Sequence, residues 1–362
     1  MKQWLKKYFK PTGMLAITAV VALGIVACSD NNTGKQSAKS TGEVQRIMGA
    51  GSSFIYPVMS RWINQYYNQT KVQVNFQPIG SGGGQRQIFN GTVNFAASDQ
   101  PLTPAELKEH HLIQFPAIVG GIAPVVNIKG VESDQLTLSG KVLAEIYLGE
   151  ITHWDDIQIQ TLNPGLKLPD GMIITIHRAD GSGTTYNFAD YLAKMSPEWK
   201  NDVGVNTTLR WPGNGVGAKG NAGVAAQVQH LPNSIGYVEY AYATEGKMTT
   251  IKLVNANGLA VAPSLESIAA AAEYAKWNPK DDYELFLTNQ PGDNSWPINA
   301  STFILLPKNN PENMNKAILK FFTWSYTDSA SKIATQLDYI PMPKNVVTGI
   351  RAYWQENLGY SS

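Results

Sequence analysis

A turn rich in glycine and hydroxyl residues lies between an apolar strand and an amphipathic helix at three places in the chain. The clearest turn, His177 to Thr184, separates the β-branched run Met172 to Ile176 from a segment, Thr185 to Met195, whose apolar residues recur at helical spacing. Similar turns lie at Gly49 to Phe54 and Ile79 to Gly84. Strands that alternate with helices predict an α/β fold with parallel strands, whose carboxyl-terminal loops form the binding edge.

The turn that ends at Thr184 has the composition of an anion-binding site. A helix start supplies unpaired backbone N–H groups and the positive end of the helix dipole. Ser182 and Thr184 add hydroxyl donors, Arg178 adds a planar guanidinium, and Gly183 lets the backbone approach a ligand. The same residues also occur in ordinary loops that end in a Ser or Thr cap, so this motif alone leaves both interpretations open.

Asp99 ends the predicted strand Val93 to Asp99 and is unexpected beside an anion. A carboxylate repels an anionic ligand unless that ligand carries a proton that the carboxylate can accept. Phosphate carries such a proton at neutral pH and sulfate does not, so an acid at this position favours phosphate. The alternative is that Asp99 caps the helix that follows Thr103.

Several classes of enzyme lack their motifs in this sequence. None of the turns continues into the Gly-Lys-Ser/Thr of a P-loop, and no Ser lies in a Gly-x-Ser-x-Gly elbow. The five histidines do not have metal-ligand spacing, so we expect no metal and no cofactor. A receptor for another oxyanion such as sulfate or molybdate remains an alternative, as does a periplasmic phosphatase with Ser182 as nucleophile.

Residues 1–27 have the features of an export signal. They hold four lysines and no acidic residue, and an apolar run from Met14 to Ala27 is too short for a comfortable membrane span. The only cysteine, Cys28, follows Ile25-Val26-Ala27, which looks like the lipobox of bacterial lipoproteins. We therefore expect lipidation at Cys28 and a flexible tether over 28–44, the alternative being an incidental Cys near another cleavage site.

The charge of the remaining chain is nearly balanced. Removal of the four lysines in 1–27 leaves 25 basic against 28 acidic residues, a net charge of −3. Such a protein has no global field that attracts nucleic acid, so an anion site must be local.

The motifs together resemble one known family, the phosphate-binding proteins of Pst-type ABC transporters. The resemblance runs from about Ile47 to the C-terminus. Its strings are Gly-Ala-Gly-Ser-Ser-Phe at 49–54, Ile-Gly-Ser-Gly-Gly-Gly at 79–84, Ala-Ser-Asp at 97–99, Arg-Ala-Asp-Gly-Ser-Gly-Thr at 178–184, Gly-Tyr-Val-Glu-Tyr at 236–240, Trp-Pro-Ile at 296–298 and Thr-Phe-Ile-Leu at 302–305.

The resemblance implies a role for each site residue. Arg178 would bind phosphate as a fork, Asp99 would accept the phosphate proton, and Asp180 would hold Arg178 in place without touching the ligand. The remaining ligand contacts would be hydroxyl or backbone N–H donors, at Ser53, Phe54, Ser81, Ser182, Gly183 and Thr184. His177 receives no role.

The resemblance also implies a two-lobed type II periplasmic binding protein fold with two crossover hinge segments. Lobe one would comprise 45–122 plus 296–362, and lobe two 123–295, with crossovers at the Gly-interrupted run Phe115 to Ile128 and at Trp296. The expected protein is not an enzyme. It is a monomeric periplasmic lipoprotein, anchored to the membrane through Cys28, that delivers inorganic phosphate to the permease subunits of an ABC transporter.

Overall fold

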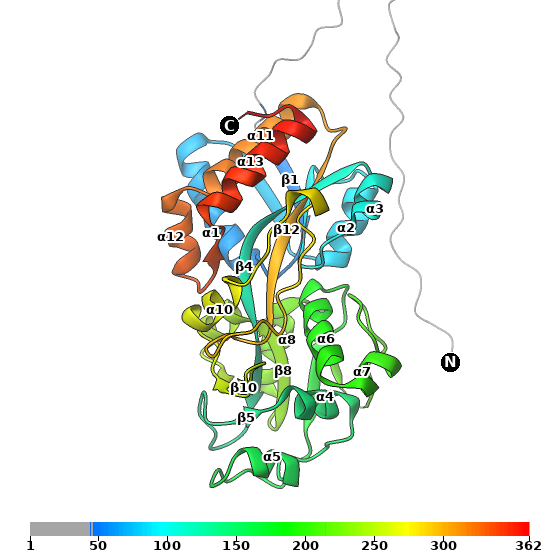
Figure 1. Ribbon diagram of the computed structural model, residues 1–362, viewed down its shortest axis with the longest axis vertical. Helices are drawn as coiled ribbons and strands as arrows, with labels where there is room; N and C mark the ends of the chain where they lie inside the picture. Colours follow the sequence, from blue (N-terminus) through cyan, green and yellow to red (C-terminus); the bar gives the residue numbers. More distant parts are fainter. Residues whose placement is uncertain (1–43, 45, 214, 362) are drawn as a thin grey trace, which may run out of the picture. The chain divides into compact units, whose positions relative to one another are not determined.

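The computed structural model describes residues 44, 46–213 and 215–361 (Figure 1). The predicted signal peptide, Cys28 and the tether up to residue 43 lie outside these residues. Within the part that is described, no helix combines the length and the apolar character needed to cross a bilayer.

Most strands belong to one large sheet. They are β1 (Arg46–Gly51), β2 (Gln73–Gln77), β3 (Phe95–Ser98), β4 (Leu112–Asn127), β6 (Ile174–Arg178), β7 (Val216–Ala218), β8 (Ser234–Glu239), β9 (Thr249–Thr250), β12 (Asn299–Pro307) and β13 (Ile340–Pro341). The order is β2-β1-β3-β12-β4-β8-β6-β7, with β9 and β13 also paired to β4. A small second sheet contains β5 (Thr137–Leu138), β10 (Lys252–Val254) and β11 (Ala260–Val261).

The prediction of parallel strands holds within each half of the large sheet and is wrong for its centre. β1 is parallel to β2 and β3, and β6 is parallel to β7 and β8. β12 is antiparallel to β3 and β4, and β4 is antiparallel to β8. The reason is that β4 carries the chain from the first half to the second and β12 brings it back, so the two strands run in opposite directions.

Strand β4 passes through both halves without a break. Its residues up to Gly121 pair with β12, and from Ile122 onward they pair with β8. The run Phe115 to Ile128, where a crossover is expected, therefore belongs to one continuous strand up to Asn127. Gly120 lies at this passage, where a Cβ would meet the Phe54 ring at 2.8 Å, so only glycine leaves room for Phe54.

Helices cover both faces of the sheet (Figure 1). Their bounds are α1 (Tyr56–Thr70), α2 (Ser81–Phe89), α3 (Pro104–Glu109), α4 (Gly140–Leu148), α5 (Ile157–Leu162), α6 (Gly183–Met195), α7 (Pro197–Asp202), α8 (Gly220–His230), α9 (Tyr240–Glu245), α10 (Leu265–Ala272), α11 (Glu312–Ser325), α12 (Asp328–Thr335) and α13 (Lys344–Leu358).

Side chains that alternate along the strands separate the cores on the two faces. In β1, Ile47 packs in the core that contains Trp62 of α1, whereas Ala50 packs with Ile88 of α2. In the second half, Val238 of β8 belongs to the core under α8, and its neighbour Tyr237 contacts Phe188 of α6. This is the period-2 pattern of a strand buried on both faces.

Two helices differ from what local sequence patterns indicate. The Ala/Glu-rich segment from Leu265 to Trp277 predicts one helix, but α10 ends at Ala272, because the N–H groups of Tyr274 and Ala275 bond three residues back in a tighter turn. Helix α13 is the second difference, since we predict no helix there from the sequence, although its buried residues Val346, Val347, Ile350, Tyr353 and Trp354 recur at helical spacing. Gly349 and two adjacent valines lower its intrinsic helix propensity, and burial of the apolar face overrides them.

Candidate functional site

The predicted site residues converge on one buried place. Ser53 follows strand β1, Ser81 begins helix α2, and Asp99 follows strand β3. From the other half of the sheet, Arg178 ends β6 and Thr184 lies in the first turn of α6. All of them are buried, and none exposes more than 4% of its surface. The three glycine-bearing turns therefore meet at the edge where the parallel strands end, as the sequence predicted.

Asp99 is held by three hydroxyl groups. Its Oδ2 accepts hydrogen bonds from Ser52 Oγ at 2.7 Å and Ser81 Oγ at 3.3 Å, and its Oδ1 accepts one from Thr302 Oγ1 at 2.7 Å. An ionised carboxylate has about four acceptor positions. Since three are used, one position on Oδ1 remains for a further donor.

Burial raises the pKa of Asp99 to about 6, although the hydroxyls of Ser52 and Thr302 and the charge of Arg178 act in the opposite direction. Asp99 is thus poised near neutrality, as a proton acceptor should be. The alternative role as a helix cap is wrong. Thr103 caps α3 itself, in a capping box with Glu106.

Arg178 and Asp180 form a tight ion pair. Arg178 Nε lies 2.7 Å from Asp180 Oδ1, and Nη2 lies 2.6 Å from Oδ2. Although burial opposes it, the hydrogen bonds and charge of Arg178 lower the pKa of Asp180. The third guanidinium nitrogen, Nη1, donates to Thr184 Oγ1 at 3.3 Å. The pairing that the family resemblance implied is confirmed, and it fixes the plane of the guanidinium.

The start of helix α6 lies directly against Asp99. Ser182 caps the helix by accepting the N–H of Thr185 at 3.0 Å. A Cβ added at Gly183 would lie 2.5 Å from Ser81 Oγ and 2.7 Å from Asp99 Cβ, distances that real side chains do not tolerate. Glycine at 183 is therefore required for the helix start to approach the acid.

Two hydrogen bonds to backbone carbonyl oxygens join the two sides of the site. Asn187 Nδ2 donates to the carbonyl oxygen of Asp99 at 2.7 Å. The N–H of Gly82 donates to the carbonyl oxygen of Gly181 at 3.0 Å. These contacts enclose the side chains of the site between the two halves of the sheet.

Two of the predicted backbone donors already have partners. The N–H of Phe54 donates to Ser52 Oγ at 2.9 Å. The N–H of Ser182 donates to the carbonyl oxygen of Thr207 at 2.8 Å. In this structure the N–H of Phe54 is therefore directed at Ser52, and the free hydrogen-bond donor of Ser182 is its hydroxyl group.

Sequence reasoning missed four residues of the site. Ser52 lies inside a turn that was identified, so its signal was present. Asn221 lies in the first turn of α8, after the short strand β7, at a fourth strand–turn–helix corner whose glycine-rich sequence is also typical of a loop. Thr302 lies in one of the strings that carry the family resemblance, but like Asn187 it contacts Asp99 only through tertiary pairing.

The charges of the site do not attract a bare anion. Arg178 and Asp180 cancel each other, so an ionised Asp99 leaves an excess of negative charge. Burial raises the pKa of nearby Glu239 well above its ordinary value, which favours the neutral form of this acid. Binding of an anion here must depend on hydrogen-bond donors and on a proton shared with Asp99.

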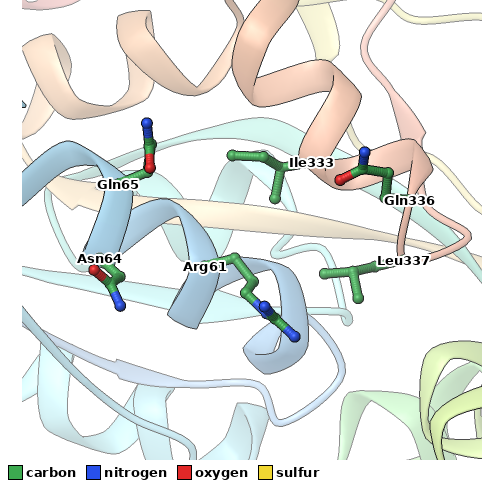
Figure 2. Close-up of a pocket in the computed structure, with 6 residues that line it drawn as sticks. All are labelled: Arg61, Asn64, Gln65, Ile333, Gln336 and Leu337. Carbon is green, nitrogen blue, oxygen red and sulfur yellow. The ribbon is translucent and has the colours of Figure 1, made fainter.

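Two further features of the described residues were compared with the predicted site: clusters of metal-binding side chains and a surface depression. Among them, no group of three His, Cys, Asp or Glu side chains could hold a metal ion. A surface depression of about 450 Å³ lies between α1 and α12 (Figure 2). It is lined by Arg61, Asn64, Gln65, Ile333, Gln336 and Leu337, and none of the predicted site residues faces it.

Comparison with known proteins gives one consistent result. Residues 34–329 match the family model described as a PBP superfamily domain. The chain is 49% identical to phosphate-binding protein PstS of Xylella fastidiosa, over 90% of this chain and 88% of that protein. It is also 49% identical to phosphate-binding protein PstS of Haemophilus influenzae, over 87% of this chain and 94% of that protein.

Two solved structures have the same fold. One is a high-affinity periplasmic phosphate-binding protein bound with phosphate, with a TM-score of 0.68, 20% identity, and coverage of 85% of this chain and 93% of that one. The other is an ABC-type phosphate transport receptor from Vibrio cholerae, with a TM-score of 0.53, 22% identity, and coverage of 82% and 100%. They confirm the predicted fold class of a two-lobed periplasmic binding protein.

Proposed function

The chain belongs to the PBP superfamily and, within it, to the phosphate-binding proteins PstS, and from this premise we propose that it binds inorganic phosphate and delivers it to an ABC import permease. The protein is a receptor and not an enzyme in this proposal. Its relatives are named for binding phosphate, and one structure with the same fold holds phosphate.

The observation that carries the proposal is the environment of Asp99. Three hydroxyls occupy three of its acceptor positions, and the remaining one, on Oδ1, can take the proton of a bound hydrogen phosphate. The other phosphate oxygens would accept from Arg178 and from hydroxyl or backbone donors at Ser53, Ser81, Ser182, Gly183 and Thr184. Sulfate has no proton to offer at neutral pH, so Asp99 would repel it.

We further propose that closure of two lobes encloses the ligand. Lobe one comprises 45–122 and 296–362, lobe two comprises 123–295, and the hinges lie where β4 and the entry to β12 pass between them. The hydrogen bonds from Asn187 to Asp99 and from Gly82 to Gly181 join these lobes. A closed face of this kind would be the surface that the permease subunits recognise.

The phosphatase alternative lacks a general base. Ser182 Oγ accepts the N–H of Thr185, and the N–H of Ser182 donates to a carbonyl oxygen. Neither partner can take the serine proton, so nucleophilic attack has no support from this geometry. Receptors for sulfate or molybdate remain outcomes of the binding test.

Isothermal titration of the purified protein tests the proposal. We expect tight 1:1 binding of phosphate and no measurable heat with sulfate at the same concentration. D99N should bind phosphate more weakly and should no longer discriminate against sulfate, because an amide can donate to a bare oxyanion. Equal affinity of the wild-type protein for the two anions would contradict the role of Asp99.

The location of the protein is part of the proposal. We expect processing before Cys28, acylation of that cysteine, and a monomeric receptor held in the periplasm by its lipid anchor, with no affinity for nucleic acid. Cell fractionation tests the anchor. The C28S variant should leave the membrane fraction or stay unprocessed, and a C28S variant that is processed and still retained on the membrane would argue against lipidation.

A further inference from the structure

Asn221 lies between two of the hydroxyl groups that are proposed to bind phosphate. It is in the first turn of α8 and is fully buried. Its Nδ2 lies 3.0 Å from Ser53 Oγ and 3.1 Å from Thr184 Oγ1. Ser53 and Thr184 come from different halves of the sheet, so one amide group connects the two sides of the site.

The orientation of this amide is determined by the backbone. The N–H of Glu239 lies 3.0 Å from Asn221 Oδ1, and a backbone N–H can only donate. Oxygen and nitrogen of the amide therefore cannot be exchanged. Nδ2 must face Ser53 and Thr184 as a donor.

The hydroxyl of Ser53 is consequently saturated as an acceptor. Its Oγ receives the backbone N–H of Asn221 at 3.1 Å and the side-chain Nδ2 at 3.0 Å. A hydroxyl group has two acceptor positions and one hydrogen to donate. Both acceptor positions are filled, so Ser53 can interact with a ligand only by donating its hydrogen.

The hydroxyl of Thr184 is saturated in the same way. Its Oγ1 receives Asn221 Nδ2 at 3.1 Å and Arg178 Nη1 at 3.3 Å. An arginine nitrogen never accepts a hydrogen bond, so the direction of this second bond is also fixed. Thr184 too can offer a ligand only its hydrogen.

We infer that Asn221 is a positioning residue that turns the hydroxyls of Ser53 and Thr184 into obligate donors and thereby selects the protonation pattern of the anion. Asp99 requires a proton on the ligand oxygen that it faces. Ser53 and Thr184 require oxygens without protons. The site therefore selects a tetrahedral oxyanion with a proton at one end and bare oxygens at the other. This inference rests on the proposed function and assigns a cause to its specificity.

Two substitutions of Asn221 separate hydroxyl orientation from simple loss of contact. N221A removes the donor, so the hydroxyls can rotate, and we expect phosphate affinity to fall roughly tenfold to a hundredfold. N221D keeps the shape and the acceptor for the N–H of Glu239 but places a second acceptor oxygen beside Ser53 and Thr184. Their hydrogens would turn toward residue 221, and we expect a larger loss of affinity than in N221A.

A double-mutant cycle distinguishes this mechanism from a structural role. If Asn221 acts through the two hydroxyls, N221A should cause little further loss of phosphate affinity in an S53A/T184V background. N127A is a matched control, because Asn127 Nδ2 holds the other end of α8 through the carbonyl oxygens of Val228 and Gln229. N127A should bind phosphate like the wild-type protein even if its melting temperature falls.

Failure of the role of Asn221 can be distinguished from failure of the proposed function. Additive losses of affinity in the cycle, with normal binding by the wild-type protein, would overturn the inference and leave the proposed function intact. A melting temperature that falls in N221A while phosphate affinity is unchanged would also overturn it. Absence of phosphate binding by the wild-type protein would instead remove the proposed function itself, and this inference with it.

Discussion

Thr302 Oγ1 donates a 2.7 Å hydrogen bond to Asp99 Oδ1 across 203 residues of sequence. Both side chains are buried, and Thr302 lies on the strand that brings the chain back into the first half of the sheet. The acid at the centre of the site is therefore held by a residue on β12, the strand on which the chain returns to this half. Pairing of β12 with β3 brings the third hydroxyl group to Asp99.

The Thr302 contact leads to the first prediction. In T302V the shape is kept and one donor to Asp99 is lost, so the pKa of Asp99 should rise further above about 6. A larger neutral fraction of Asp99 accepts the phosphate proton less well. We expect phosphate affinity at pH 7 to fall by about fivefold to tenfold, since one such bond contributes about 1 kcal/mol. Titration calorimetry measures the affinity of T302V for phosphate. An unchanged affinity would exclude a role for Thr302 in phosphate binding.

The second prediction concerns stability in the absence of phosphate. Asp99 has a pKa of about 6 in the folded protein and an ordinary value of 3.8, so the folded state binds the proton more tightly. Its stabilising contribution is present below pH 3.8 and is lost as the pH rises through 6. The difference between the two values corresponds to roughly 3 kcal/mol.

Urea unfolding of the phosphate-free protein at pH 5 and pH 7.5 measures this effect. The free energy of unfolding of the wild-type protein should fall more steeply over this range than that of D99N, in which residue 99 does not titrate. The difference between the two pH profiles isolates Asp99 from the other acids. Parallel profiles would show that Asp99 titrates normally in the folded state.

The third prediction concerns the Arg178 fork. Arg178 binds both oxygens of Asp180 and also Thr184, which a single ammonium group cannot do in the same geometry. R178K keeps the charge but loses the fork, and we expect roughly a tenfold to hundredfold loss of phosphate affinity, the size of one charge-assisted hydrogen bond. If R178K bound as tightly as the wild-type protein, the positive charge alone would be sufficient.

The fourth prediction concerns the close approach of Gly183 to Ser81 and Asp99. In G183A the added methyl group would hold the start of α6 away from both residues, because the space is too small for a Cβ. We expect phosphate affinity to fall by roughly fivefold to a hundredfold, from an overpacking cost of about 1–3 kcal/mol. Small-angle scattering should show less compaction on addition of phosphate than in the wild-type protein.

The control for this variant is G223A. Gly223 also lies in the early part of a helix, but a Cβ there would meet only ordinary contacts, the nearest at 3.6 Å. It should bind phosphate and compact like the wild-type protein. Normal phosphate binding by G183A would mean that the start of α6 need not lie as close to Ser81 and Asp99 as it does in this structure.

Local sequence determined the parts of the site that need only a few neighbouring residues. The turns at Gly49 to Phe54, Ile79 to Gly84 and His177 to Thr184 were recognisable because a strand, a glycine and a helix start are consecutive in the chain. The pair of Arg178 and Asp180 is also local, since the two residues are two positions apart. The apolar patterns likewise predicted the strand before Asp99 and the helix after Thr184, which are β3 and α6 in the structure.

Tertiary structure decided what lies opposite each of these turns. Thr302, Asn187 and Asn221 enter the site through strand pairing and helix packing between distant segments. β4 and β12 are likewise antiparallel because the chain passes from the first half to the second along β4 and returns along β12. The sequence by itself thus specified which groups could bind an anion, because that chemistry belongs to individual residues and turns. Only the fold decided which hydroxyl faces which acceptor, because the direction of a hydrogen bond depends on both partners.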